Sequence, residues 1–272
     1  MLMKRTLLPV GSVAIAFYCL IPFIWFVLTS LKLPAELTAI PPKIIPSVHW
    51  GFYRSALEKY GLLHYIANSI VVAGLTTSVT VVIGSLAGYA IARFRLAWTR
   101  FYLMVLLAIS MFPQIAIAGP VWSLLNRLDW LNSYQGLVAA YIALCLPLAT
   151  WILSTFFSQV PAELEEAALA DGCTRLQALY KVVLPLAAPG IATAALLVFI
   201  YAWNEFFFAL IIMTDPNVQT LPVGIALFPG EYTTPWGEIA AASTIATIPL
   251  ILLTLIFQRG IVRGLSAGAV KG

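Results

Sequence analysis

LEEAALADGCTRLQALYKVVLP, residues 164–185, is the most polar long stretch in a chain that otherwise consists largely of apolar runs. Hydrophobic residues make up 61% of the 272 residues, and charged residues only 10%. Soluble domains carry about 25% charged residues, so the composition favours a membrane protein. The polar stretch is therefore expected to face something other than lipid.

Six uncharged runs flank this stretch, and each is long enough to supply the roughly 20 residues that a helix needs to cross a bilayer. The runs cover residues 6–31, 66–92, 101–126, 130–162, 182–204 and 239–258. They predict an all-α membrane protein with six transmembrane helices, because a helix satisfies its own backbone groups in lipid. The expected spans, all within one continuous domain of residues 1–272, are approximately 7–31, 66–92, 101–125, 135–158, 189–212 and 239–260.

The placement of Lys and Arg predicts the orientation of these spans. With the N-terminus in the cytoplasm, ten basic residues face the cytoplasm: Lys4, Arg5, Arg93, Arg95, Arg100, Arg175, Lys181, Arg259, Arg263 and Lys271. Five face outward: Lys32, Lys43, Arg54, Lys59 and Arg127. Both termini are then cytoplasmic, residues 261–272 form a cytoplasmic tail, and residues 213–238 form an external loop. The first run is too long for a cleaved signal peptide and is interpreted as a retained helix.

Several kinds of chemistry are not favoured by the sequence. The net charge of +4 follows from the topology and gives no indication of nucleic acid binding. Cys19, Cys145 and Cys173 lack metal-ligand spacing, and His49 and His64 are interpreted as ordinary loop residues, so no metal site is expected. No phosphate-binding Gly-x-x-x-x-Gly-Lys-Ser/Thr motif occurs, so no bound nucleotide or other cofactor is expected. An intramembrane hydrolase lacks the necessary His or Asp residues within the expected spans.

Residues within the spans suggest both packing and a pathway. Gly84 and Gly88 have the small-xxx-small spacing that permits close helix approach in lipid. Four prolines within three of the runs predict bends, which suit either a lined pathway or simple helix packing. These prolines are Pro22, Pro113, Pro120 and Pro147.

Glu205 is an ionisable residue near the outer end of the fifth run, where a carboxylate is usually functional or faces water. Alternatively it marks only the membrane interface, with Tyr201 and Trp203 as interfacial aromatics. Aromatic rings beside amide and carboxylate groups suit a sugar, whose faces stack on rings and whose hydroxyls need hydrogen-bond partners. The candidate substrate pathway comprises Tyr201, Trp203, Asn204, Glu205, Phe207 and Gln114.

The polar stretch lies between the fourth and fifth spans, on the cytoplasmic side, and its pattern predicts two helices. Pro161 and the acidic residues of 163–166 favour a helix start, and Asp171-Gly172 favours its end. Thr174–Gln177 has capping-box spacing for a second helix that ends at Leu184-Pro185. An amphipathic helix lying on lipid headgroups is the alternative, but the acidic front is repelled by an anionic leaflet. A protein partner is the better interpretation.

The polar stretch also resembles a known family. The run Glu166-Ala167-Ala168, followed by Gly172 and then by Val182-Val183-Leu184-Pro185, looks like the EAA loop of the membrane permeases of bacterial ATP-binding-cassette importers. Val182 departs from the Ile that the family prefers. The chain resembles the shorter permease subunit of the maltose-type carbohydrate importers over nearly its whole length. The other matching pieces are Asn68-Ser69, Tyr89-Ala90-Ile91-Ala92-Arg93, Met111-Phe112-Pro113, Trp203-Asn204-Glu205, Thr220–Gly224 and Gly264–Gly272.

The resemblance implies roles for three segments. Residues 163–176 are expected to form a coupling helix that docks on an ATPase subunit, with contacts from Glu163, Glu165, Glu166, Ala167, Ala168, Asp171, Gly172 and Leu176. The external loop is expected to reach into a sugar-binding receptor through Leu227, Phe228, Pro229, Gly230 and Glu231. The tail is expected to contact the ATPases through Ala267, Gly268, Ala269, Val270 and Lys271.

The implied function is that of a non-catalytic permease subunit in the bacterial inner membrane, forming half of the pathway for a di- or oligosaccharide such as maltose or trehalose. The expected partners are a second homologous permease, two ATPase subunits that hold ATP and Mg, an external sugar-binding protein and the bilayer, but no nucleic acid. Motion of the ATPases is expected to pass through Leu184-Pro185 into the fifth span as one continuous lever. Two alternatives are an importer permease for a non-sugar solute and a proton-coupled sugar transporter that uses Glu205.

Overall fold

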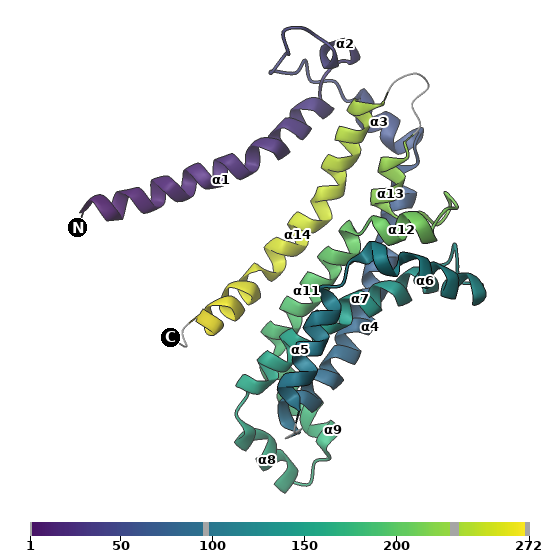
Figure 1. The fold of residues 1–272 in the computed structure, drawn as a ribbon. Helices are drawn as coiled ribbons and strands as arrows, with labels where there is room; N and C mark the ends of the chain where they lie inside the picture. The colour runs from purple at the N-terminus through teal and green to yellow at the C-terminus, as the bar shows by residue number, and fades with distance from the viewer. Residues whose placement is uncertain (1, 95–97, 229–233, 270–272) are drawn as a thin grey trace. The chain divides into compact units, whose positions relative to one another are not determined.

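The computed structural model describes residues 2–94, 98–228 and 234–269. These described residues form α-helices, one π-helix and connecting segments, with no β-strand among them. In chain order (Figure 1) the elements are α1 (Leu2–Ser30), α2 (Pro34–Leu37), α3 (Gly51–Glu58), α4 (Leu62–Arg93), α5 (Thr99–Ser110), α6 (Gln114–Arg127), α7 (Tyr134–Gln159), α8 (Ala162–Ala170), α9 (Arg175–Ala178), the π-helix η1 (Leu179–Val183), α10 (Leu184–Leu186), α11 (Ala188–Asn204), α12 (Phe207–Ile212), α13 (Leu221–Ala226) and α14 (Trp236–Ala269).

Four helices in the described part of the chain are long and apolar enough to cross a membrane: Val13–Ser30 of α1, all of α4, all of α7, and Trp236–Phe257 of α14. Two bent helix pairs bring the number to six if each pair counts as one span. Phe101–Ser110 and Gln114–Arg127 meet at 87°, and Arg175–Leu186 and Ala188–Asn204 meet at 81°. The all-helical class is confirmed, and the membrane-spanning count lies between four and six.

The helix expected over residues 101–125 is two helices because of Pro113. Proline lacks a backbone N–H and disfavours helical geometry in the residue before it. Pro113 adopts φ −60° and ψ 123°, an extended conformation, and is the N-cap residue of α6 instead of continuing α5. Pro120 and Pro147, by contrast, lie inside helices that continue past them.

The expected continuous lever through the fifth span is also corrected. The second helix of the polar stretch does not end at Leu184-Pro185; it continues through η1 and α10 to Leu186. The bend of 81° falls at Ala187, whose φ of −89° and ψ of 6° end the helix before Pro189 starts the next one. At its far end α11 stops at Asn204, because Glu205 is extended with ψ 127°. The element is therefore interrupted on both sides.

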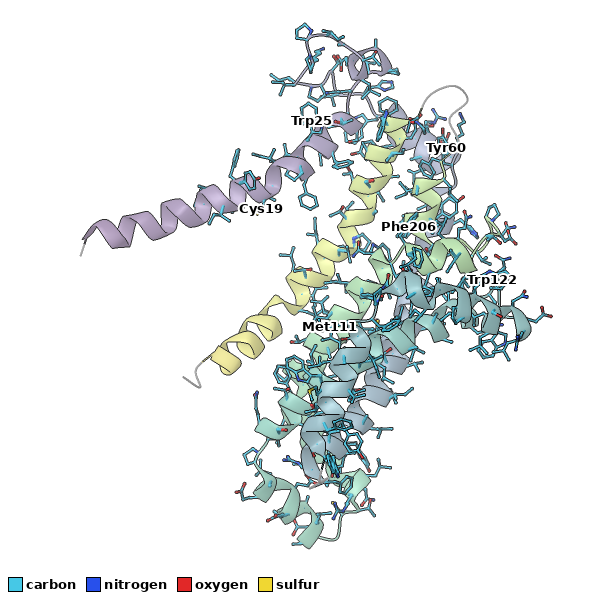
Figure 2. The ribbon with its side chains drawn as sticks, viewed as in Figure 1. Cys19, Trp25, Tyr60, Met111, Trp122 and Phe206 are labelled. Atoms are coloured by element: carbon cyan, nitrogen blue, oxygen red, sulfur yellow. The ribbon has the colours of Figure 1, made fainter. Side chains whose placement is uncertain are left out.

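The chain divides into two compact units, which are described separately. The first comprises the residues up to Ile66 and Gly224–Pro249. In it, the ring of Phe52 on α3 packs over Gly237 at the start of α14, where a Cβ atom would lie 2.4 Å from the ring. Tyr60 stacks on Phe228 with ring centroids 4.4 Å apart. From Val13 to Val27, α1 carries exposed apolar side chains, including Cys19 and Trp25 (Figure 2), as expected for a lipid-facing or partner-facing helix.

The second unit comprises Ala67–Val223 and the residues from Leu250 onward. Its central helix, α7, contacts α5, α11 and α12. A buried cluster joins α4, α7, α11 and residues 179–187: Tyr89, Leu153, Phe157, Val160, Leu179, Val183, Ala187 and Ala194. A Cβ added to Gly88 would lie 2.9 Å from the backbone nitrogen of Ser154, so this glycine permits α4 to approach α7 closely. The interpretation of the Gly84–Gly88 spacing as a packing motif is confirmed.

Candidate functional site

The polar stretch folds at one end of the second unit as the helices α8 and α9 (Figure 1). The Thr174 hydroxyl accepts from the Gln177 backbone N–H at 3.3 Å, and the Gln177 side chain accepts from the Thr174 N–H at 2.9 Å. This capping box is the predicted one. Gly172 has φ +89°, a left-handed conformation that glycine adopts without strain, and it ends α8 as predicted.

The α8–α9 segment presents an acidic surface with small side chains. Six of the eight residues assigned to ATPase contact are exposed: Glu163, Glu166, Ala167, Asp171, Gly172 and Leu176. Ala168 is half-buried. Exposed carboxylates beside alanines allow a second protein surface to approach the helix backbone closely and to meet it with basic groups.

Glu165, the eighth residue of that set, points inward. Its side chain is 7% exposed and forms an ion pair with Arg93, with 2.7 Å between Nε and Oε2. The Tyr89 hydroxyl donates to the other carboxylate oxygen, and Arg93 also donates to the Val160 carbonyl at 2.9 Å. Glu165 therefore holds α8 against the end of α4 and is not part of the exposed contact surface.

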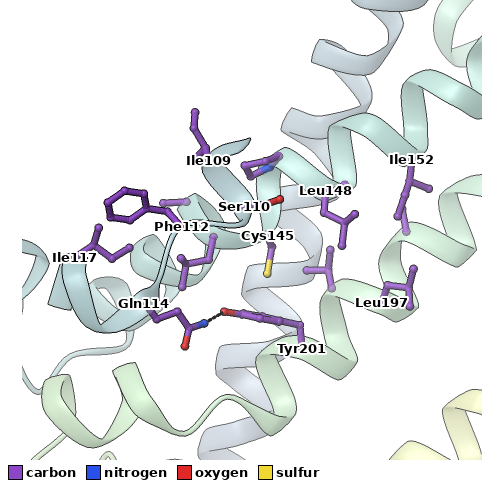
Figure 3. A pocket seen from close by; sticks show the side chains of 16 residues that line it. Ile109, Ser110, Phe112, Gln114, Ile117, Cys145, Leu148, Ile152, Leu197 and Tyr201 are labelled. Atoms are coloured by element: carbon purple, nitrogen blue, oxygen red, sulfur yellow. Dashed lines mark hydrogen bonds between the residues drawn. The ribbon is translucent and has the colours of Figure 1, made fainter. Parts of the chain in front are cut away.

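An apolar cavity of about 430 Å³ lies among α5, α6, α7 and α11 (Figure 3). Its lining is mainly aliphatic, and its polar side chains are Ser110, Gln114, Cys145 and Tyr201. Figure 3 shows Gln114 and Tyr201 together at one edge of the cavity, where the Gln114 amide donates to the Tyr201 hydroxyl at 2.5 Å. A cavity of this kind offers few partners to a solute with many hydroxyl groups.

A second, more open pocket of about 450 Å³ shares Gln114 and Tyr201 with the first. Its other lining residues are Ile200, Asn204, Glu205, Phe206 and Phe207. The Asn204 amide donates to the Ile200 carbonyl at 2.8 Å and is otherwise exposed. Along α11, this pocket lies farther from the polar stretch than the apolar cavity. The Gln114–Tyr201 pair therefore lies where the two spaces meet.

The pathway residues predicted from the sequence are only partly brought together. Gln114, Tyr201, Asn204, Glu205 and Phe207 all line the open pocket. Trp203 does not: it is 2% exposed and stacks on Phe199 with centroids 5.7 Å apart. Residues two positions apart do not share a face of an α-helix, whereas residues three apart do, so Trp203 points away from the face that carries Tyr201 and Asn204.

Glu205 lines the open pocket but is also a structural residue. Its carboxylate accepts from the Tyr141 hydroxyl at 2.6 Å, and from the backbone N–H groups of Phe208 at 2.9 Å and Ala209 at 3.1 Å. A carboxylate at a helix start satisfies N–H groups that have no partner within the helix. Glu205 therefore fixes the turn from α11 into α12.

The segment before α13 is anchored by polar residues that were not among the predicted site residues. The Asn68 amide on α4 donates to the carbonyls of Asn217 at 3.2 Å and Gln219 at 2.8 Å. The Asn68 oxygen accepts from the Tyr134 hydroxyl at 2.7 Å, and Ser69 accepts from the Leu221 N–H at 2.7 Å. The sequence signal for this role was the presence of polar side chains inside an apolar run, because such groups need hydrogen-bond partners within the protein when lipid surrounds it.

Two predicted contact segments fall partly outside the described residues. In the external loop, Leu227 is exposed and Phe228 is buried, while Pro229, Gly230 and Glu231 lie outside the described residues. In the tail, α14 continues through Ala267, Gly268 and Ala269, whereas Val270 and Lys271 lie outside. Within the described part of the chain, no group of three His, Cys, Asp or Glu residues could hold a metal ion.

Comparisons with known proteins identify relatives of this chain. The trehalose/maltose transport system permease protein MalG of Thermococcus litoralis is 44% identical, covering 99% of this chain and 98% of the relative. The sulfoquinovosyl glycerol transport system permease protein SmoH of Agrobacterium fabrum is 42% identical, covering 93% of this chain and 89% of the relative. A chain of a bacterial ABC transporter involved in alginate import has the same fold, with a TM-score of 0.79 at 22% identity over 94% of this chain and 97% of that chain.

A family model supports the same assignment over most of the chain. Residues 80–267 match the model of the binding-protein-dependent transport system inner membrane component. The matched residues include the polar stretch, both cavities and most of α14. The chain is a multi-pass inner membrane protein and belongs to the family of binding-protein-dependent transport system inner membrane components.

Proposed function

We propose that the chain is the permease subunit of an ATP-driven importer and forms half of the translocation pathway for a sugar. The observation that carries the proposal is the α8–α9 segment, whose exposed acidic and alanine-rich surface is fixed to the end of the bundle that encloses both cavities. A docking element held in this way transmits the movement of a partner into the walls of a pathway.

The proposed substrate is a di- or oligosaccharide such as trehalose, maltose or a related glycoside. The relatives named for trehalose/maltose and for sulfoquinovosyl glycerol support this class. The open pocket offers hydroxyl and amide groups at Tyr201, Gln114 and Asn204, beside the rings of Phe206 and Phe207. Sugars need both kinds of contact. The apolar cavity beyond the Gln114–Tyr201 pair acts as a barrier, because it cannot replace the water around sugar hydroxyls.

The energy for import comes, in this proposal, from partner subunits. ATP and Mg bind to two ATPase subunits, which contact Glu163, Glu166 and Gly172 on the cytoplasmic side. The other partners are a second homologous permease and an external sugar-binding protein. A solved structure with the same fold, with a TM-score of 0.59 at 14% identity, was determined in complex with an alginate pentasaccharide-bound periplasmic protein. Both termini of this chain lie in the cytoplasm.

A proton-coupled carrier is less well supported. Such a carrier needs a carboxylate that exchanges its partners during transport. Glu205 instead accepts from Tyr141 and from two backbone N–H groups that shape the α11–α12 turn. Its contacts favour a structural role in the wall of the pocket.

The test is transport by the complete complex reconstituted in vesicles with the ATPases, the sister permease and the binding protein. Uptake of radiolabelled trehalose or maltose is expected only with external binding protein and internal ATP. Glu166→Lys reverses the charge of an exposed side chain on α8, and Gly172→Pro is incompatible with φ +89°, so both are expected to abolish uptake in assembled complexes. Accumulation without nucleotide would overturn the proposal.

A further inference from the structure

Helix α4 contacts both the polar stretch, through Tyr89 and Arg93, and the segment before α13, through Asn68. It runs without a break from Leu62 to Arg93. Asn68 and Arg93 are 25 residues apart in the helix, which corresponds to about 38 Å at 1.5 Å per residue. Figure 1 shows α8 and α9 beyond one end of the bundle to which α4 belongs.

At one end, α4 holds both helices of the polar stretch. Arg93 pairs with Glu165 at 2.7 Å and donates to the Val160 carbonyl, so it holds both α8 and the C-cap residue of α7. Tyr89 donates to Glu165 and lies 3.5 Å from the Arg175 carbonyl at the start of α9. The Arg175 guanidinium in turn lies over the Phe94 ring, 5.0 Å from its centroid.

At the other end, α4 holds the backbone of residues 217–221. Asn68 donates to two of its carbonyls, and Ser69 accepts the Leu221 N–H. Asn68, Ser69 and Gln219 are all buried. These contacts attach α4 to backbone groups of the segment. A movement of α4 therefore displaces the backbone of the segment and not only one side chain.

The chemistry at each end favours joint movement. A buried ion pair is strongly coupled because little solvent screens it, and separating it leaves two charges without partners. Buried amide-to-carbonyl hydrogen bonds are similarly costly to lose without replacement. The α11 route, by comparison, is bent by 81° at Ala187 and ends at Asn204.

We propose that α4 is the transmission element of this subunit, and that Tyr89, Arg93 and Glu165 at one end and Asn68 and Ser69 at the other are its positioning residues. The proposal rests on the proposed function, since it assigns the route by which ATPase movement at α8 reaches the segment that leads into α13 and the receptor-facing loop. Gly84 and Gly88 let α4 approach α7 through a surface of small residues.

The test compares ATPase stimulation by sugar-loaded binding protein in complete complexes assembled in nanodiscs. Tyr89→Phe removes one hydroxyl and keeps the ring, and Asn68→Ala removes the hydrogen bonds to the Asn217 and Gln219 carbonyls at the far end. Each is expected to lower the stimulation ratio by roughly fivefold or more, the range of ordinary allosteric coupling. Ser78→Ala is the matched control, because Ser78 is exposed on the same helix and donates only to Gly74 of its own helix. It is expected to keep the wild-type ratio.

A double variant separates transmission from local damage. Sites this far apart normally act independently, so two unrelated losses multiply. If α4 is a single route, Tyr89→Phe with Asn68→Ala loses no more stimulation than the more affected single variant. Multiplied losses, or full stimulation in both single variants, would overturn the proposal.

A second measurement follows the segment itself and does not depend on ATPase rates. Asn217→Cys, placed in a Cys19→Ser, Cys173→Ser background, is labelled with a maleimide in the absence of nucleotide and with ATP and vanadate. Labelling is expected to change at least twofold with nucleotide in the parent, and to become insensitive to nucleotide in Glu165→Gln. Equal nucleotide sensitivity in both backgrounds contradicts transmission through α4. A wild-type complex that shows no stimulation by loaded binding protein refutes instead the proposed function.

Discussion

Two buried carboxylates lie in the second unit and are neutralised by different means. Glu165 pairs with Arg93 and accepts from Tyr89, so a full positive charge from another helix compensates it. Glu205 accepts from Tyr141 and from the N–H groups of Phe208 and Ala209. In the described part of the chain, no Lys or Arg forms an ion pair with Glu205.

Glu165 therefore acts as a joint between two helices, whereas Glu205 shapes a turn between consecutive helices. The ion pair ties α8 to α4, which are distant in sequence, and its contribution depends on both partners remaining in place. The Glu205 contacts act mainly within the chain from residue 205 to 209 and shape a local reversal of direction. Substitutions that remove each compensating group test this distinction.

The largest expected effect comes from Arg93→Gln, which leaves Glu165 buried without its cation. Loss of one partner of a buried ion pair costs about 3–5 kcal/mol. We expect the thermal unfolding temperature of the purified complex to fall accordingly, and Arg93→Gln combined with Glu165→Gln to recover much of the loss. A double variant as unstable as the single one would show that Glu165 is not held as a charge by Arg93.

The next effect in size is expected for Glu205→Ala. This change leaves the Tyr141 hydroxyl and two N–H groups without their acceptor, at a cost of about 2–3 kcal/mol. Glu205→Gln keeps one oxygen acceptor and is expected to cost less. Thermal unfolding measures both variants, and ATP-dependent uptake by Glu205→Gln shows whether the charge is needed for transport. If Glu205→Gln abolishes uptake without affecting stability, Glu205 acts on the solute directly.

Two tyrosine variants test the same difference between Glu165 and Glu205, and each removes only one hydroxyl group. Tyr141→Phe and Tyr89→Phe each remove one hydroxyl that donates to a buried carboxylate, with an expected cost of about 1–2 kcal/mol. The stability losses are expected to be similar. Only Tyr89→Phe is expected to uncouple ATPase stimulation, because only Tyr89 lies at the joint with α8. If both variants lose ATPase stimulation equally, Glu165 and Glu205 do not differ in the way proposed.

The sequence was sufficient for the parts of this fold that depend on local patterns. Apolar run lengths predicted the four unbroken helices that are long enough to span a membrane, Thr174 and Gln177 predicted a capping box, and Asp171-Gly172 predicted the end of α8. Each depends on residues within a few positions of one another. The EAA pattern also indicated the family that the comparisons established.

The sequence was not sufficient where a partner lies far away along the chain. Glu165 and Glu166 are adjacent and acidic, and only the packing of α8 on α4 decides that Glu165 meets Arg93 while Glu166 is exposed. Glu205 stood out as an ionisable residue, but the hydroxyl that donates to it belongs to Tyr141, 64 residues away along the chain. The 81° bend likewise lies at Ala187, past the helix end expected at Pro185, and the π-helix of Leu179–Val183 before it has no clear sequence signal.

A third carboxylate, outside the membrane-spanning segments, gives the smallest and most local prediction. Glu36 accepts from Lys43 and Ser47, and from the N–H groups of Leu33 at 3.1 Å and Ser47 at 3.2 Å. These contacts lower the pKa of Glu36 from 4.5 to about 2. The hydrogen bond from Lys43 has the largest effect, and the hydrogen bond from the Ser47 side chain has the next largest. Like Glu165 it is paired with a cation, but that cation is half-exposed.

Because the pKa of Glu36 is lower in the folded chain, the ionised form stabilises the connection between α1 and α3. This stabilisation is complete above the unfolded value of about 4.5 and is lost as the pH falls from 4.5 towards 2. Hydrogen exchange of residues 31–50 is expected to accelerate over that range, and Glu36→Gln is expected to exchange rapidly at every pH. The parent exchange rate is corrected for the intrinsic pH dependence. If the corrected rate does not change with pH, Glu36 does not organise this connection. A half-exposed cation would then contribute too little to hold a carboxylate in place.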